Sequence, residues 1–214
     1  FDNKSIDQSD SFYNMKENLK IISLRLINQK WINNIEFDAQ GYPIGFSQNS
    51  QEVLVPAFIS AYTGNNANSV GLNPISDKPK INWSIQYDGL SDGLKDIFSR
   101  ISLRHSYRSN FTINNFQSNL NYSENSFNSV GDYESKIFFS NINLVEQFNP
   151  LIRVDLELKN SLRLSFDVIK DRAVSLSLAN NLITESWGDE YSIGIGYRAR
   201  NLKLWSRFAS TGNR

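Results

Sequence analysis

The chain has 214 residues, with 22 Lys and Arg against 22 Asp and Glu, so its formal net charge is zero and offers no electrostatic basis for binding nucleic acid or an acidic membrane surface. The absence of cysteine excludes a disulfide framework, a CxxC redox site and thiolate metal ligands. The sequence contains no run of 18 apolar residues, so it predicts no transmembrane helix.

The first 80 residues show helical periodicity. Apolar residues recur there at spacings of three and four: Phe12, Met15, Leu19, Ile22 and Leu26. This spacing predicts a helix that begins after an N-cap at Ser9, Asp10 or Ser11. The alternation of Ile22, Leu24 and Leu26 suggests a strand instead, but the helical pattern is longer.

A second, shorter helix is predicted over residues 50–62, closed by Gly64. Pro56 would lie inside this helix or mark its first turn. Residues 63–80 are rich in Gly, Pro and Asn, which predicts a loop.

From residue 81 the hydrophobic period changes to two, which predicts β-strands. Clear alternation covers residues 81–87, 101–108, 150–158, 162–168, 174–178 and 191–197, and weaker patterns cover 111–122 and 136–146. Strands of about 9–11 residues, with no Pro in their middles, would suit a tilted crossing of a bilayer.

One hairpin allows its register to be derived. A three-residue turn at 159–161 sets opposite charges across the two strands, pairing Glu157 with Arg163 and Arg153 with Asp167. A slip of two residues would set like charges opposite each other or would keep only one charge pair.

This alternation predicts two faces. The charged and polar face is predicted to line the lumen of a barrel: Arg153, Asp155, Glu157, Lys159, Arg163, Ser165, Asp167 and Arg198. The apolar face is predicted to contact lipid: Ile152, Val154, Leu156, Leu158, Leu162, Leu164, Phe166 and Val168. Because a soluble sandwich also alternates, alternation alone does not decide between the two folds. Short turns between successive strands, and aromatic residues near strand ends, favour a transmembrane β-barrel.

Five short segments resemble, in the same order, parts of the SprA/Sov family, the outer-membrane translocon of the type 9 secretion system. They are QEVLVPAFISAYTG at 51–64, NWSIQYDGL at 82–90, LRHSYRS at 103–109, EQFNPL at 146–151 and GIGYR at 194–198. Proteins of that family are giant, so the resemblance implies the C-terminal part of a longer chain. The start at Phe1 without an initiator Met, and the turn-like end, also lead us to expect a piece of a longer protein.

The resemblance implies that residues 81–214 are up-and-down strands of a very large antiparallel transmembrane β-barrel. Residues 1–80 would form a helical and loop insert at its rim or in its lumen. The count of the predicted strands places this insert on the same side as the 123–135 loop. The whole protein would be a pore in the Gram-negative outer membrane that exports folded cargo carrying a C-terminal sorting domain. Its implied partners are a PorV-type outer-membrane barrel, a periplasmic plug protein and outer-membrane lipid. No nucleic acid, cofactor, metal or catalytic residue is implied.

Enzymatic interpretations are weak. His105 is the only histidine, and in a strand the neighbouring Ser102 and Ser106 would point away from it, so we expect His105 to be structural. Asp155, Glu157 and Asp167 are carboxylates of the type that glycosidases use, but a wall of ion-paired residues explains them more simply. A TonB-dependent-type transporter barrel and a soluble secreted β-sandwich or adhesin remain alternatives.

Overall fold

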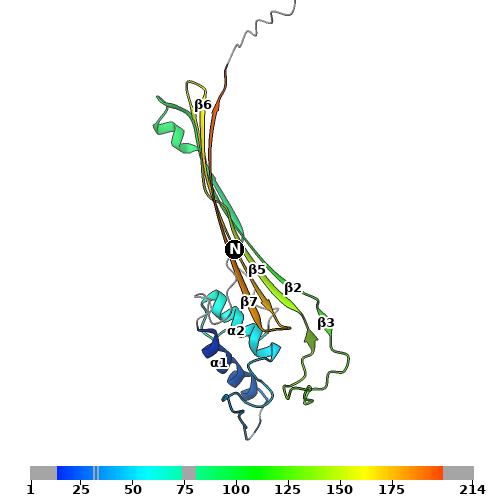
Figure 1. Ribbon diagram of the computed structural model, residues 1–214. Helices are drawn as coiled ribbons and strands as arrows, with labels where there is room; N and C mark the ends of the chain where they lie inside the picture. Colours follow the sequence, from blue (N-terminus) through cyan, green and yellow to red (C-terminus); the bar gives the residue numbers. More distant parts are fainter. Residues whose placement is uncertain (1–13, 31, 33, 74–80, 200–214) are drawn as a thin grey trace, which may run out of the picture. The chain divides into compact units, whose positions relative to one another are not determined.

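The computed structural model describes residues 14–30, 32, 34–73 and 81–199. It is mostly β, with a five-stranded open antiparallel sheet and two N-terminal helices. The helices are α1 (Met15–Asn28) and α2 (Gln51–Thr63), and the sheet strands are β1 (Trp83–Tyr87), β2 (Phe98–Asn114), β5 (Asn141–Leu158), β6 (Leu162–Ser177) and β7 (Leu182–Tyr197) (Figure 1). A short helix η2 (Gly89–Gly93) follows β1, and β3 (Gln117–Ser118) pairs with β4 (Ile137–Phe138).

The chain divides into two compact units. The helix unit consists of Phe1–Asn82, Arg108–Gln147 and Asp171–Gly188, and the strand unit consists of Trp83–Tyr107, Phe148–Lys170 and Asp189–Arg214. Neither described helix is long and apolar enough to cross a membrane.

The predicted first helix is confirmed from Met15 onward. Its apolar residues at spacings of three and four, including Leu19, Ile22 and Leu26, are buried along one side of α1. The competing strand interpretation of residues 22–26 is therefore wrong. The expected N-cap at Ser9, Asp10 or Ser11 lies outside the described residues.

The predicted second helix is confirmed to within one residue at each end. Gly64 follows α2 with a φ of 70°, the left-handed conformation that closes helices and that glycine adopts at little cost. Pro56 lies inside α2 rather than in its first turn. It removes one backbone hydrogen bond, and the burial of residues 53–60 offsets that loss.

The hydrophobic core of the helix unit lies between the two helices and alternate residues of three strands. The strand contribution consists of Ile142 and Leu144 of β5, Val174 and Leu176 of β6, and Ile183 of β7. Met15 and Ile22 of α1 and Phe58 of α2 are fully buried in the same cluster.

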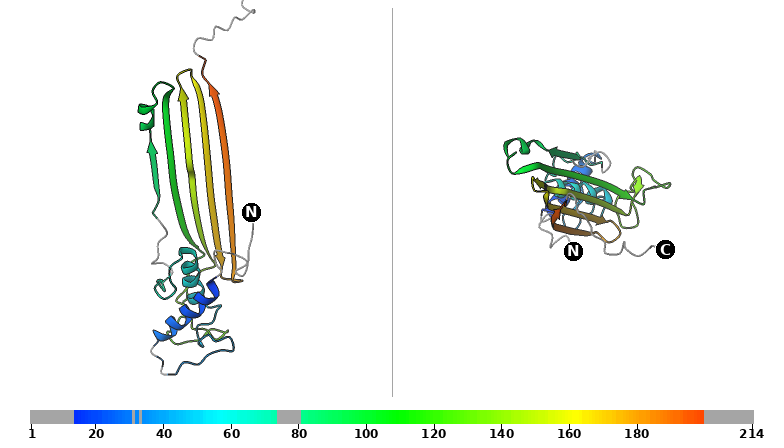
Figure 2. Two further views of the ribbon diagram at one scale, coloured as in Figure 1. Left: turned by 90° about the vertical axis from the view of Figure 1, so that its left-hand side faces the viewer. Right: turned by 90° about the horizontal axis from the view of Figure 1, so that it is seen from above.

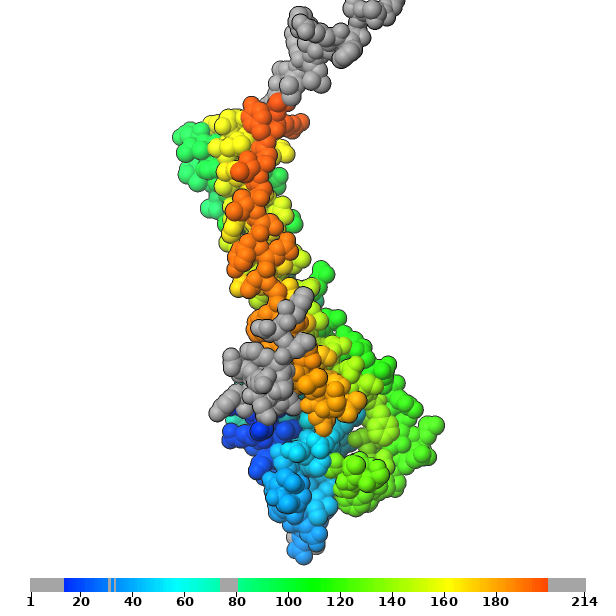
Figure 3. Space-filling model, in the orientation of Figure 1, coloured from blue at the N-terminus to red at the C-terminus, as the bar shows by residue number. Residues whose placement is uncertain are grey.

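The loop of residues 123–135 belongs to the helix unit, as expected, and Asp132 joins it to the segment after α1. One carboxylate oxygen of Asp132 accepts the Ser47 N–H at 2.6 Å, and the other accepts the Ser47 hydroxyl at 2.7 Å. Gly45 forms a β-bridge with Asp132. Figure 3 shows the atoms of this green loop against those of the blue and cyan N-terminal segment.

The sheet order β1-β2-β5-β6-β7 follows the sequence, so the predicted up-and-down connection of the long strands is confirmed (Figure 2). The β5–β6 turn is residues 159–161, as derived from the charge pattern.

The predicted strand lengths were wrong. β5, β6 and β7 have 18, 16 and 16 residues, because the segments expected at 136–146 and 150–158 lie largely in one strand, as do those at 162–168 and 174–178. Pro150 lies inside β5, against the expectation of strands without internal Pro. Between the alternating segments 162–168 and 174–178, Lys170 and Arg172 pair with acids of β7, and β6 continues through them.

Candidate functional site

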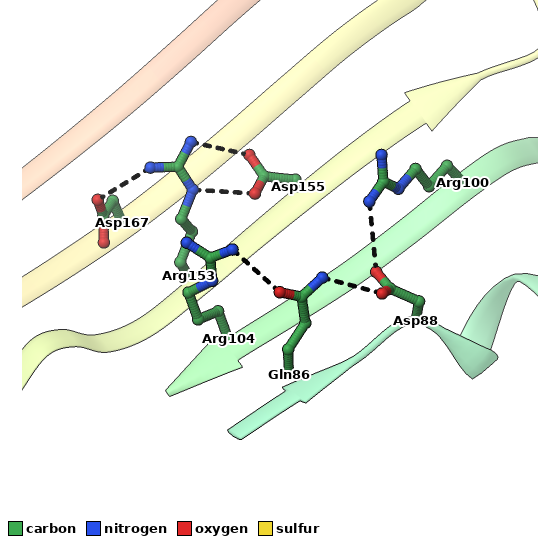
Figure 4. Close-up of polar contacts among 7 residues, drawn as sticks. All are labelled: Gln86, Asp88, Arg100, Arg104, Arg153, Asp155 and Asp167. Atoms are coloured by element: carbon green, nitrogen blue, oxygen red, sulfur yellow. Dashed lines mark hydrogen bonds and ion pairs between the residues drawn. The ribbon is translucent and has the colours of Figure 1, made fainter. Parts of the chain in front are cut away.

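The strand unit has a polar face formed by even-numbered residues of β1, β2 and β7 and by odd-numbered residues of β5 and β6. On this face the Arg153 guanidinium contacts two carboxylates (Figure 4). Its Nε lies 2.9 Å from Asp155 on the same strand, and its Nη1 lies 3.6 Å from Asp167 on the neighbouring strand. The predicted cross-strand pair of Arg153 and Asp167 is confirmed.

A second chain of polar contacts runs from β1 to β2 (Figure 4). Arg104 donates to the Gln86 side-chain oxygen at 2.9 Å, and the Gln86 amide donates to Asp88 at 2.9 Å. Asp88 in turn lies 3.7 Å from Arg100. The antiparallel register places Gln86 opposite Arg104, which explains why these side chains meet.

A hollow of about 510 Å³ lies on the polar face. Arg163 borders it and pairs with Glu157 at 3.2 Å, which confirms the second predicted charge pair. Gly194 and Gly196 of β7 also line it, and a Cβ at Gly194 would collide with the Ser165 hydroxyl. The missing side chain at Gly194 therefore gives the Ser165 hydroxyl room against β7.

The charges named on this face are balanced. Four arginines (Arg100, Arg104, Arg153 and Arg163) lie among four carboxylates (Asp88, Asp155, Glu157 and Asp167). Such partly exposed ion pairs each contribute at most about 1 kcal/mol to stability. Glu190 of β7 has the same parity, so the face as a whole is a hydrated surface on which both signs of charge are mixed.

The opposite, apolar face of the strand unit is formed by the odd-numbered residues of β1, β2 and β7 and the even-numbered residues of β5 and β6. Large side chains on it are exposed, among them Ile85, Ile152, Phe166, Tyr191, Ile193, Ile195 and Tyr197. Ile193 and Ile195 are 78% and 75% exposed. Water is an unfavourable environment for so much contiguous apolar surface.

Aromatic residues gather at one end of this apolar face. The rings of Trp83 and Tyr107 stack with centroids 4.4 Å apart, and Tyr107 contacts Phe148 at 4.9 Å. His105 Nδ1 lies 2.6 Å from the Leu151 carbonyl oxygen, while the Ser106 hydroxyl hydrogen-bonds the Asn149 carbonyl. His105 and Ser106 thus have separate backbone partners, as a structural role for His105 predicts.

The helix unit has a charged cluster centred on Arg172. Its Nη2 lies 2.7 Å from Glu185, which is 3% exposed, and its Nη1 lies 3.7 Å from Glu146. The Arg172 guanidinium also lies over the rings of Tyr62 and Trp187, at 5.4 and 4.8 Å from their centroids. The sequence analysis did not identify this cluster, because its members lie on separate elements and come together only when the strands pair.

A second hollow, of about 480 Å³, lies in the helix unit beside the start of α2. Burial raises the pKa of the Glu52 carboxyl there, and the positive charges of Lys30 and Lys136 partly oppose that rise. Lys30 also lies 4.4 Å from the centre of the Tyr133 ring. Among the described residues, no group of three His, Asp or Glu side chains is arranged to hold a metal ion.

Comparison of the sequence with models of known protein families and with curated proteins gives no match. Any functional conclusion therefore rests on the two faces and on the sequence resemblance.

Most of the predicted site residues lie within the strands where the alternation placed them. The predicted polar residues on β5 and β6 are all odd-numbered and belong to the polar face: Arg153, Asp155, Glu157, Arg163, Ser165 and Asp167. The eight predicted apolar residues, from Ile152 to Val168, are all even-numbered and belong to the apolar face. Lys159 lies in the β5–β6 turn, and Arg198 follows the end of β7. The prediction did not include Gln86, Asp88, Arg100 or Arg104, although alternation in 81–87 and 101–108 contained the signal for Gln86 and Arg104.

Proposed function

We propose that this chain is a wall segment of a very large outer-membrane β-barrel that exports folded proteins, as in the SprA/Sov translocons of type 9 secretion. The observation that carries the proposal is the opposition of the two faces in the strand unit. One face leaves branched and aromatic side chains exposed, and the other carries balanced, paired charges. Lipid outside and water inside would satisfy both faces.

The length of the apolar face supports a bilayer crossing. On β5 the apolar face extends from Phe148 to Leu158, a span of ten residues along the strand. At about 3.3 Å per residue this is ~33 Å of strand, and a tilt of about 35–45° reduces it to a height of ~23–27 Å. The apolar band of outer-membrane barrels is about 25 Å tall.

The polar face suits passage of many different proteins. A selective porin concentrates one sign of charge at a constriction, whereas this face alternates the two signs. Apart from Phe98, Leu151 and Ile169, the strand residues of this face are charged, polar or glycine, so a passing polypeptide would meet little apolar surface to which it could adhere.

The segments that resemble the family lie in both units. Residues 51–64 include α2, 82–90 include β1, 103–109 lie in β2, 146–151 lie in β5 and 194–198 include the end of β7. On this proposal the partners are those of the family: a PorV-type barrel, a periplasmic plug protein and cargo with a C-terminal sorting domain.

Adjacent residues on opposite faces provide the test. A photo-crosslinking amino acid at Ser165 is on the polar face, and the same amino acid at Leu164 is on the apolar face. In cells that hold a stalled cargo protein in the full-length channel, we expect cargo adducts from position 165 and none from 164. Position 164 is expected to yield lipid adducts instead.

Equal cargo adducts from both positions, or none from either, would contradict the proposal. Recovery of the protein from the aqueous fraction with position 164 crosslinked within its own chain would instead support the soluble β-sandwich. Every variant is first checked for insertion and export activity, so that a folding defect is recognised before crosslinking.

A further inference from the structure

The hollow of about 480 Å³ lies within the helix unit, and every residue that lines it belongs to that unit. Its walls come from the end of α1, the start of α2 and the segment that contains β4. Gln51 joins two of these walls, because its amide donates to the Ile137 carbonyl oxygen at 2.7 Å and its side-chain oxygen accepts the Phe139 N–H at 3.2 Å. Hollows of this volume commonly hold small ligands.

The lining combines apolar side chains with a few charged groups. The apolar residues are Leu26, Phe46, Leu72, Ile137 and Phe139. The charged residues are Lys30, Glu52, Glu124, Glu134 and Lys136, so three carboxylates stand against two ammonium groups and leave one negative charge in excess. Such a lining suits a ligand with an apolar body and one charged end.

The two lysines already have partners. Lys30 Nζ donates to the Glu124 carbonyl oxygen at 2.8 Å and lies 4.4 Å from the centre of the Tyr133 ring. Lys136 Nζ lies 5.3 Å from the centre of the Tyr122 ring. Both ammonium groups are therefore stabilised by contacts that an anionic ligand would have to replace.

The carboxylates differ in their surroundings. Glu134 accepts a hydrogen bond from the Asn119 amide at 2.8 Å, and Glu124 is exposed to water. Glu52 is half-buried, and its carboxylate makes no hydrogen bond or ion pair with any other described residue. The two lysines only partly oppose the rise of its pKa that burial causes. Because burial of a carboxylate without a hydrogen-bond donor is unfavourable, Glu52 is the group at which a ligand with donors would bind.

We propose that this hollow binds a cation with N–H donors on an apolar stem: a lysine or arginine side chain of a polypeptide, or a free alkylamine. The charged end lies against Glu52, and the stem lies along Leu26, Phe46 and Phe139. The cation neutralises the excess negative charge of the lining and supplies the charge-assisted hydrogen bonds that Glu52 lacks. This inference goes beyond the proposed function and does not depend on the assignment of either face of the strand unit.

Replacement of Glu52 tests the site without a folding defect. Glu52→Gln is expected to stabilise the folded protein at neutral pH, because it removes a half-buried charge whose pKa is raised. A residue that lowers the stability of the free protein while it lines a hollow is typical of a binding site.

The experiment is isothermal titration calorimetry on the full-length protein in detergent. The cationic probes are N-acetylarginine amide and butylammonium, and N-acetylnorleucine amide and butyrate are the matched neutral and anionic compounds. We expect saturable binding of a cation with a dissociation constant of ~1 mM or below, and no binding of the neutral or anionic compounds. Glu52→Gln is expected to weaken cation binding at least about tenfold, because hydrogen bonds to a charged group are lost. Glu17→Gln removes the same charge from the first turn of α1 and is the control, with an expected change within about twofold.

The two cations distinguish the source of the ligand. Tighter binding of N-acetylarginine amide assigns the site to a basic side chain, and tighter binding of butylammonium assigns it to a free amine. Binding of butyrate as tight as that of butylammonium, equal cation binding by Glu52→Gln and by the unchanged protein, or no saturable binding of either cation would overturn the proposal. None of these three results would affect the proposed function, whose test lies on the strand unit.

Discussion

Arginine substitution along the apolar face of β5 gives a quantitative test of lipid exposure. The band from Phe148 to Leu158 has its midpoint near residue 153. On the proposed function, Ile152 and Val154 would lie closest to the bilayer centre and Leu158 at its edge. An arginine on the lipid face of an outer-membrane barrel costs about 2–4 kcal/mol at the midplane and about 0–1 kcal/mol near the interface.

We therefore expect Ile152→Arg and Val154→Arg to destabilise the protein by about 2–4 kcal/mol, and Leu158→Arg by about 1 kcal/mol or less. Ser165→Arg on the polar face is the control and is expected to cost less than Ile152→Arg or Val154→Arg, because the added charge stays in water. The measurement is the urea midpoint of the full-length protein in lipid vesicles, followed by tryptophan emission and converted with the slope of the transition.

A soluble sandwich would give a different profile. There the same face would lie in a dry core, and an unpaired buried arginine would be costly at 158 as well as at 154. Equal costs at these two positions, or a cost at 154 no larger than that at 165, would refute the lipid-facing assignment.

Three further changes probe the helix unit, each followed by the unfolding midpoint of the full-length protein. Gly45→Ala is expected to destabilise the protein by more than about 2 kcal/mol, because Gly45 has a φ of 95° and a Cβ there would lie 2.5 Å from the Tyr133 ring. Gly64→Ala is the milder control, because a Cβ at Gly64 would meet open space. Equal losses of stability in the two variants would contradict the steric argument. Asp132→Ala is expected to cost about 3 kcal/mol or more through loss of its two hydrogen bonds to Ser47, and a change under about 1 kcal/mol would show that they contribute little. Glu52→Gln is expected to stabilise the folded protein at neutral pH. A carboxyl whose pKa is raised in the folded state contributes stability below its unfolded pKa, and this contribution is lost as the pH rises through the folded pKa. The gain in stability should therefore disappear in acid, and a gain that does not depend on pH would refute this cause.

The sequence predicted local structure well where one physical signal dominated. Spacings of three and four apolar residues located α1, and Gly64 located the end of α2. Opposite charges at Glu157 and Arg163 were sufficient to place the β5–β6 turn, because any slip of register would have broken a pair.

The strand lengths could not be predicted in the same way. Lys170 and Arg172 interrupt the apolar pattern of β6, and a local reading treats such an interruption as a turn. Their partners, Asp189 and Glu185, lie on another strand and are visible only once the strands are paired. For the same reason, the cluster around Arg172 was missed, since it depends on side chains far apart in the sequence.

The position of these charges gives them a role in the proposed wall. On β6, Val168 ends the apolar run, Lys170 and Arg172 follow, and Val174 is again buried, now beneath the helices. Placed within the lipid band, each cation would cost about 2–4 kcal/mol, whereas near its edge the cost falls to about 0–1 kcal/mol. Lys170 pairs with Asp189 and Arg172 with Glu185, so both cations have acidic partners on β7. A strand with valine or leucine at both positions would carry no such boundary, and it could slide along the membrane normal without penalty. On the proposed function, the two ion pairs would oppose movement of Lys170 and Arg172 into the lipid and so would limit how far β6 enters the bilayer.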